Sequence, residues 1–357
     1  MIEATFNAVT PTPIVAEFEA IIPREKTLPV ANKSVSITEN GEYKVQADAD
    51  TVMTEVGIEV AIPYKTRYVE FNDSGFAALI AEKFGCNVGV TEEQAAGIDT
   101  IPARFARGNA EIKDASGLSK FTNLTSIGSD AFASCTNLTG DLIIPDSVTM
   151  MGEWAFYMGF VSGTDRLFIN LNTRPLLTTD THPNSRQPIS STGFKEIYID
   201  DMQALVKSEI PWFYNSVAAS LYTWDLYVNG VLTKDIVLDC PETHTVISRI
   251  LAGSSITSVK FNDGFTNILS MTFDYCRSLS LIDLPSTITS IAIYAFRSIK
   301  SNCTIVCRAL TPPVLGNQVI FIPSSIYVPD ESVEAYKTAS VWSAYATKIK
   351  PLSEYQE

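Results

Sequence analysis

Histidine is almost absent from this chain of 357 residues, which contains only His182 and His244. Each lies in a polar stretch, TTDTHPNSRQP or DCPETHTVIS, and neither has a second histidine or a cysteine at ligand spacing. Histidine is the side chain best suited to proton transfer near neutral pH and is the most common metal ligand. Its scarcity disfavours catalysis and metal binding. We therefore expect no enzyme activity, no metal and no cofactor.

Cysteines are also few, and none forms a closely spaced pair of the kind that binds zinc. Cys303 and Cys307 stand four residues apart and would share one face of a strand, so a redox pair or a disulfide is an alternative to inward packing there. We expect small, reduced and mostly buried side chains at the six positions, which are Cys86, Cys135, Cys240, Cys276, Cys303 and Cys307.

The chain has neither an excess of positive charge nor a long apolar run. Its formal net charge is −14, which would repel nucleic acid. No apolar run approaches the ~20 residues of a membrane span, so we expect no membrane insertion. The opening residues, MIEATFNAVTPTPIVAEFEA, lack the basic and apolar segments of a signal peptide. Read from Met1, the chain is not expected to use the general secretory route.

The chain does contain internal repeats. IPDSVTMMGEWAF at 144–156 matches LPSTITSIAIYAF at 284–296, and a further Ala-Phe or Thr-Phe pair lies 24 or 23 residues upstream. This period is typical of leucine-rich repeats, whose coils stack because one coil cannot bury its own apolar edge. Each coil should supply a short strand, a proline turn and an inner wall. The predicted repeat core is Phe132, Cys135, Leu138, Pro145, Phe156, Phe273, Cys276, Leu279, Pro285 and Phe296.

A second duplicated module follows each set of coils. FKEIYIDDMQALVKSEIPW at 194–212 parallels SSIYVPDESVEAYKTASVW at 324–342, and in each a strand meets acidic residues that can cap a short helix. Between the halves, Asn229-Gly230 predicts a hairpin that opens the second half. In residues 74–98, Ser74 and Thr91 are the predicted N-caps of a helix pair that covers the first coil.

These patterns predict an α/β repeat fold, a leucine-rich-repeat solenoid of short strands with irregular or short-helical returns. The N-terminal residues differ, because SVSITENGEYKV and TEVGIEVAI alternate as β-strands do. The predicted domains are an N-terminal β module or anchor arm at 1–66, a helical cap at 67–112, a first repeat half with its end module at 113–215, and a second at 216–357.

Four phrases occur in the order found in a known family: LTSIGSDAFASCTNLT, IPDSVTMMGEWAF, LYVNGVLTKDIVL and IYVPDESVEAYKTASVWSAYATKIKPL. Over roughly residues 75–357 the chain thus resembles the BspA-like leucine-rich repeat proteins of gut and oral bacteria and their phages. The N-terminal segment ITENGEYKV…VGIEVAI separately resembles a short β motif of phage tail and virion proteins. The resemblance implies a repeat body used for adhesion or receptor contact.

Candidate contact residues lie where the two halves differ. The polar loop 178–193 has only a short counterpart in the second half, and an aromatic cluster follows it. Such features carry contacts in repeat scaffolds, although a tolerated surface insertion and packing between modules are the alternatives. The candidate contact surface comprises His182, Asn184, Arg186, Trp212, Tyr214, Tyr222 and Trp224.

The first functional hypothesis is a non-enzymatic phage structural protein, such as a fibre, decoration or receptor-binding element. Residues 1–66 would bind other virion proteins, and the repeat body would contact a host protein or glycan. Its expected location is the virion, and a homo-oligomer is expected, with a trimer as one form. The alternatives are an adhesion or host-interaction protein at the bacterial cell surface, and a carbohydrate-binding module using exposed aromatic residues.

Overall fold

The computed structural model divides the chain into two compact units, Met1–Tyr68 and Val69–Glu357. The structure describes the backbone alone of residues 2–5, 26–30, 34–37, 41–49, 52–60, 213–214 and 245–246. It describes in full, except for the side chain of residue 207, residues 67–86, 89–161, 165–170, 188–190, 192–207, 223–242, 249, 251–316 and 323–356.

The first unit contains two small sheets. One is the antiparallel pair β1 (Ile2–Thr5) and β3 (Ser34–Ile37). In the other, β4 (Gly41–Ala49) pairs in parallel with β2 (Lys26–Val30) and antiparallel with β5 (Val52–Val60). β3 and β4 therefore belong to different sheets.

Two helices open the second unit: α1 (Ser74–Phe84) and α2 (Glu92–Ala96). The prediction of Thr91 as N-cap is confirmed, with a capping box to Gln94. The prediction of Ser74 is wrong by one residue, since the Asp73 carboxylate accepts the backbone N–H of Phe76 at 2.7 Å. Its other oxygen accepts the backbone N–H of Lys113 at 2.8 Å, so one carboxylate both caps the helix and ties it to the first coil.

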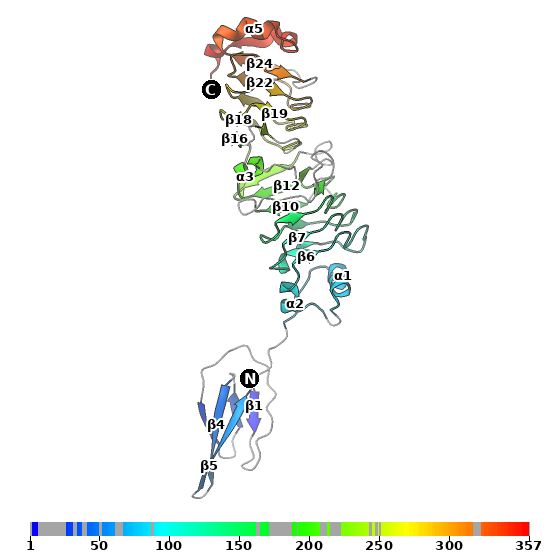
Figure 1. The fold of residues 1–357 in the computed structure, drawn as a ribbon, viewed down its shortest axis with the longest axis vertical. Helices are drawn as coiled ribbons and strands as arrows, with labels where there is room; N and C mark the ends of the chain where they lie inside the picture. The colour runs from blue at the N-terminus through cyan, green and yellow to red at the C-terminus, as the bar shows by residue number, and fades with distance from the viewer. Residues whose placement is uncertain are drawn as a thin grey trace. The chain divides into compact units, whose positions relative to one another are not determined.

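The first half stacks parallel strands on two sides of the coils, as Figure 1 shows. Its long strands form one sheet, with a final antiparallel strand, in the order β15 (Val231–Leu232), β14 (Asp225–Val228), β12 (Glu196–Ile199), β10 (Arg166–Ile169) and β8 (Asp141–Ile143). The short strands are β6 (Thr100–Ile101), β7 (Ser126–Ile127) and β9 (Met150–Met151), then β11 (Ile189–Ser190) with β13 (Phe213–Tyr214).

The second half repeats this arrangement with parallel strands throughout. Its long strands are β16 (Asp235–Leu238), β18 (Ser258–Phe261), β20 (Leu281–Leu284), β22 (Cys303–Cys307), β24 (Pro323–Val328) and β25 (Ile349–Pro351). Its short strands are β17 (Thr245–Val246), β19 (Asn267–Ile268), β21 (Ser290–Ile291) and β23 (Val314–Leu315). The fold is therefore a repeat-containing α/β fold with many parallel strands and few helices.

The repeated Ala-Phe phrase forms the inner wall of the coils. The rings of Phe132 and Phe156 stack at 5.2 Å and 5°, and those of Phe273 and Phe296 stack at 5.2 Å and 9°. In each half the first phenylalanine donates its backbone N–H to the alanine carbonyl of the next coil, at 2.7 and 2.8 Å. All ten residues of the predicted repeat core are buried.

Each half ends in a strand, a short helix and a further strand. The helices are α3 (Met202–Lys207) and α5 (Val333–Thr338), and short 3-10 turns η2 (Asp330–Ser332), η3 (Trp342–Lys348) and η4 (Leu352–Glu354) surround α5. Asp201 accepts the backbone N–H of Gln203 at the start of α3, as predicted. Asp330 does not cap α5, because its carboxylate accepts the backbone N–H of Ser353 instead.

The junction between the halves differs from the prediction. Asn229 and Gly230 adopt φ of 50° and 75° and join β14 to β15, as a tight hairpin requires. This hairpin completes the first sheet and does not open the second, so the change of sheet follows Leu232 rather than residue 216. The free edge of β16 is covered by Gln203, whose amide donates to the Val237 carbonyl at 3.0 Å and accepts the Asp239 N–H at 2.8 Å.

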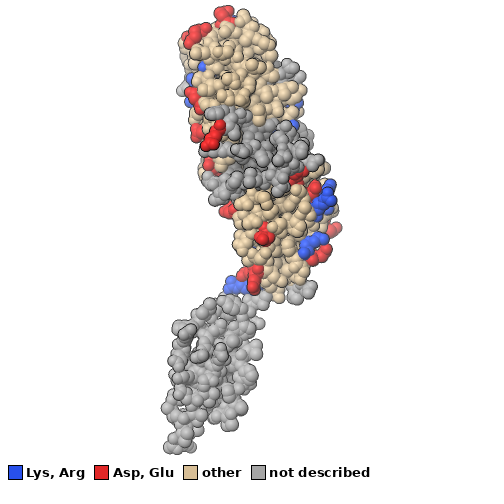
Figure 2. Space-filling view, viewed as in Figure 1, with Lys and Arg blue, Asp and Glu red and all other residues tan. Residues whose placement is uncertain are grey.

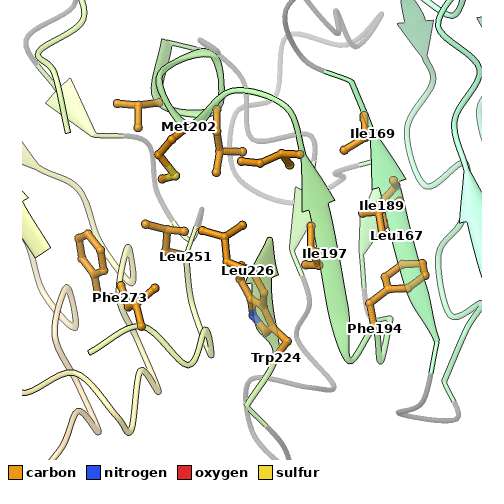
Figure 3. Close-up of a cluster of buried hydrophobic side chains, with 14 of the residues drawn as sticks. Leu167, Ile169, Ile189, Phe194, Ile197, Met202, Trp224, Leu226, Leu251 and Phe273 are labelled. Carbon is orange, nitrogen blue, oxygen red and sulfur yellow. The ribbon is translucent and has the colours of Figure 1, made fainter. Parts of the chain in front are cut away.

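A continuous core runs through both halves of the second unit. Figure 3 shows Trp224 and Leu226 between Ile197 of the first half and Leu251 of the second. The Trp224 indole N–H donates to the Ala252 carbonyl at 2.8 Å, which satisfies its one polar group inside the core. In the part of the chain that the structure describes, no helix has the length and apolarity to cross a membrane.

Candidate interaction surface

The outer face of the first-half sheet carries two rows of side chains. Alternate residues of a strand point to opposite faces, and parallel register aligns them from strand to strand. The residues that we call the aromatic row are Ile143, Phe168, Tyr198, Tyr227 and Leu232, in the order of the strands. Beside them lies the charged row of Asp141, Arg166, Glu196 and Asp225.

The three rings of the aromatic row form one stack. Phe168 and Tyr198 lie 4.4 Å apart at 14°, and Tyr198 and Tyr227 lie 4.4 Å apart at 12°. The row ends in exposed aliphatic residues, Ile143 at 37% and Leu232 at 44% exposure. Because each ring covers the face of its neighbour, the stack presents ring edges and hydroxyl groups to solvent. Each stacked pair contributes about 0.5–1.5 kcal/mol beyond the area it buries.

Side chains of the charged row hold one another, and the aromatic row, in place through ion pairs and hydrogen bonds. Arg166 binds both Asp141 oxygens, through Nε at 2.7 Å and the second nitrogen at 2.5 Å, and its guanidinium lies 5.4 Å from the Phe168 ring centre. This contact with Asp141 raises the pKa of Arg166. The Tyr198 hydroxyl donates to Glu196 at 2.7 Å, which raises the pKa of Tyr198. Acidic groups outnumber basic ones in this row.

The equivalent row in the second half has a different character. It consists of Val237, Lys260, Asp283, Val306, Tyr327 and Lys350. Asp283 is paired with Arg308 by two hydrogen bonds of 2.9 Å, and Lys350 lies 5.7 Å from the Tyr327 ring centre. The two sheets share strand geometry but not surface chemistry. On the face seen in Figure 2, charged side chains of the described residues gather toward the margins.

One group of side chains resembles a nucleophile with a base. Lys234 Nζ lies 2.5 Å from Asp225 Oδ1 and 2.5 Å from Ser255 Oγ, and Ser255 also donates to Asp225. An ammonium that donates to a carboxylate has no lone pair with which to accept the serine proton. Burial raises the pKa of Asp225, but the hydrogen bonds from Lys234 and Ser255 outweigh it and the pKa is lowered. We interpret this cluster as a tie between the hairpin and the next coil.

The described cysteines are free thiols without a metal-binding arrangement. Burial raises the pKa of Cys135 and Cys307 to about 11 and that of Cys276 and Cys303 to about 12. Thiols with such pKa values stay protonated and unreactive near neutral pH. Among the described residues, no group of three His, Cys, Asp or Glu side chains could hold a metal ion.

The structure tests few of the contact residues that the sequence suggests. His182, Asn184, Arg186, Trp212 and Tyr222 lie outside the described residues, as does His244, and of Tyr214 only the backbone in β13 is described. Trp224 is only 1% exposed, so its assignment to a contact surface is wrong and the packing alternative applies to it.

Sequence reasoning missed the aromatic row, although a signal for it exists. Phe168, Tyr198 and Tyr227 each stand third in a four-residue strand, in RLFI, EIYI and DLYV. Comparing these strands with each other would have shown one outward aromatic residue at the same place in three successive coils.

Repeated units that each add a short strand and a longer strand to mostly parallel sheets are consistent with a leucine-rich repeat architecture. A family model for the BspA type leucine-rich repeat region matches residues 113–163 and 236–312, in six copies. These two segments of the chain therefore contain BspA-type leucine-rich repeats. A search of curated proteins finds no match. Phe168, Tyr198 and Tyr227 lie between the two matched segments, in the part of the repeat body that departs from the family pattern.

Proposed function

We propose that this protein is a non-enzymatic binding protein whose coils form one leucine-rich-repeat solenoid and whose aromatic row contacts a partner. The observation that carries this proposal is the ring stack with exposed aliphatic ends, on an outer face where strand geometry requires no aromatic residue. Aromatic residues are enriched in protein interfaces and dominate their binding energy.

The arrangement of the rings favours a protein partner over a neutral sugar. A sugar stacks on an open ring face, whereas the inner faces of this stack are covered by neighbouring rings. The excess of acidic groups in the charged row, together with the net charge of −14, favours a partner with a basic rim. The carbohydrate-binding module is therefore the weaker candidate for this face.

A cross-linking pair tests the contact. A photoreactive phenylalanine analogue replaces Ile143 in one variant and Val237 in the other, since both are exposed aliphatic residues at equivalent places on the two sheets. We expect cross-links to a partner from position 143 and few from position 237. Equal yields at both positions would contradict a contact centred on the aromatic row.

For the setting of this contact we propose a phage structural role, in which residues 1–66 attach the protein to the virion. A separate compact N-terminal unit and the resemblance of its sequence to virion β motifs support this proposal. The BspA-like repeats favour the alternative, an adhesion protein at the bacterial cell surface. Immunogold labelling of particles and cells from the source culture distinguishes them. Label on particles that is lost when residues 1–66 are deleted supports the virion role, and label on cells alone overturns it.

A further inference from the structure

A second surface feature lies in the turns that lead from the short strands to the long strands of the second half. There, four side chains alternate, and we call them the cation–aromatic stack: Arg277, Tyr275, Arg297 and Tyr294. Arg277 lies 5.5 Å and Arg297 lies 5.1 Å from the Tyr275 ring centre, and Arg297 lies 4.4 Å from that of Tyr294. Such contacts hold a guanidinium over an aromatic ring in a defined orientation.

The stack is built on a buried anchor. Asp274 is 1% exposed and binds two nitrogens of Arg297, one of them at 2.9 Å. The Tyr275 backbone N–H also donates to the Arg297 carbonyl at 2.8 Å. Arg297 is therefore immobilised between the tyrosine rings, and the surface formed by the stack is organised before any ligand arrives.

Backbone geometry does not explain the tyrosines. Tyr275 has φ of 60° and Tyr294 has φ of 62°, in the left-handed region that disfavours residues with a Cβ atom. The preceding coil has Gly253, with φ of 76°, at the place of Tyr275. Glycine would fit the turn at a lower conformational cost, so the backbone does not require a tyrosine at either place.

Positive charge is concentrated around the stack in an otherwise acidic protein. Arg249 lies at the repeat position of Met271, with its Nε 3.4 Å from the Met271 sulfur, and Lys300 lies 23 residues after Arg277 at the same repeat position. In the turns spanning residues 251–257, 269–280 and 292–302, all of which the structure describes, the one acidic residue is Asp274. The chain as a whole has a net charge of −14.

The spacing of the exposed cations indicates what could bind. Arg277 and Lys300 are one coil apart, about 4.8 Å in the direction of strand stacking. Acidic side chains on one face of an extended peptide stand about 6.7 Å apart, which matches this spacing poorly. A chain of uronic acid sugars carries one carboxylate on each ring, at about one ring length. Guanidinium groups bind carboxylates through paired, charge-assisted hydrogen bonds.

We propose that the cation–aromatic stack binds a carboxylated saccharide chain, with Arg277 and Lys300 on successive carboxylates and the tyrosines beside the sugar rings. This site is separate from the aromatic row. It would bind negatively charged groups, whereas the acidic residues beside the aromatic row favour a partner with basic groups. It supplies local positive charge to a protein whose overall charge repels polyanions, so binding should weaken steeply as salt is added.

The test is calorimetric titration of the full chain with oligogalacturonate and with the neutral oligosaccharide made from it by carboxyl reduction. We expect the acidic form to bind and the neutral form to bind at least about tenfold more weakly. Arg277→Ala should lower the affinity about tenfold, and Arg277→Lys should restore part of it. Arg277 is exposed, so circular dichroism should show an unchanged fold in both variants.

Arg104→Ala is the matched control, because Arg104 is an exposed cation with φ of 58° in the equivalent turns of the first half. It removes the same charge and should leave the affinity unchanged. Three results overturn the proposal: no binding of oligogalacturonate, an equal loss of affinity in Arg104→Ala, or equal binding of the neutral oligosaccharide. If a hexaglutamate peptide binds as tightly as oligogalacturonate, the site takes acidic peptides and the saccharide assignment is wrong.

Discussion

The two halves of the repeat body share a backbone plan and differ in what they show to solvent. In the first half, the outer row of the long sheet is a stack of three aromatic rings. In the second half, the same row is divided by the ion pair of Asp283 with Arg308, and positive charge gathers in the turns instead. The inner walls share their ring geometry, with stacked phenylalanine pairs at 5.2 Å in both. The two halves therefore share the inner wall that folding requires and differ on their outer surfaces.

The largest expected effect tests whether the inner walls are equivalent. Phe156→Ala and Phe296→Ala each remove one ring of a stacked, fully buried pair, so each should lower the free energy of unfolding by about 3–5 kcal/mol. Urea denaturation followed by tryptophan fluorescence measures both. A loss below about 1 kcal/mol in one variant alone would show that the halves do not depend on the wall equally.

The second largest effect compares the stability contributed by a buried ion pair in the second half with that of an exposed ion pair in the first half. Arg308→Ala leaves Asp283, which is 7% exposed, without its guanidinium partner, so stability should fall by about 3 kcal/mol. Arg166→Ala breaks a similar pair on the exposed face of the first half and should cause no resolvable change. Thermal melts of the two variants give the comparison. Equal melting temperatures would contradict the difference in burial that we describe.

Alkaline pH should weaken the second half more than the first. Burial raises the pKa of Cys276 and Cys303 to about 12 and of Cys307 to about 11, from an ordinary 9.0, whereas the first half has one such thiol, Cys135. Because the folded pKa values are raised, this contribution is complete below pH 9 and is lost as the pH rises toward 11–12. Each thiol should contribute a loss of about 1 kcal/mol at a pH of about 10.

The check for this pH effect is a series of urea midpoints measured from neutral pH to about pH 10. Cys276→Ala serves as the control, because it removes one titrating thiol and should flatten the pH dependence while lowering stability at every pH. A midpoint that stays constant over this range would contradict protonated thiols in the folded core.

The smallest effect concerns the aromatic row itself. Tyr198→Ala removes the middle ring of the stack and should cost only about 1 kcal/mol of stability, since the rings are partly exposed. The same substitution should greatly reduce the yield of partner cross-links from position 143, by more than such a small loss of stability could explain. If Tyr198→Ala unfolds the protein, the row belongs to the structural core and the binding proposal loses its support.

The inner wall was predictable from the sequence because its signal is local. Spacings of three and four residues within one coil, and an Ala-Phe pair in each, follow from stacking alone. The outer face was not predictable in this way. Its rows depend on which residues of separate strands come into register, and the strands are 25, 30 and 29 residues apart, from Asp141 to Arg166, from Phe168 to Tyr198 and from Tyr198 to Tyr227.

Two predictions made from local sequence were wrong because contacts with residues distant in the sequence determine the outcome. The cap of α1 shifted from Ser74 to Asp73 because the carboxylate also binds the backbone of the first coil. Trp224 looked like a surface aromatic residue in sequence, but the coil after it supplies a carbonyl for its indole N–H, and it is buried.

Gln203 lies at the boundary between the long sheets of the two halves. One amide side chain, in place of a whole strand, covers the free edge of β16, where the second sheet begins. Neither sheet therefore fixes the number of strands in the other. The number of coils in the second half can therefore differ without a change in the register of the first-half sheet, whose order is set by its own strands.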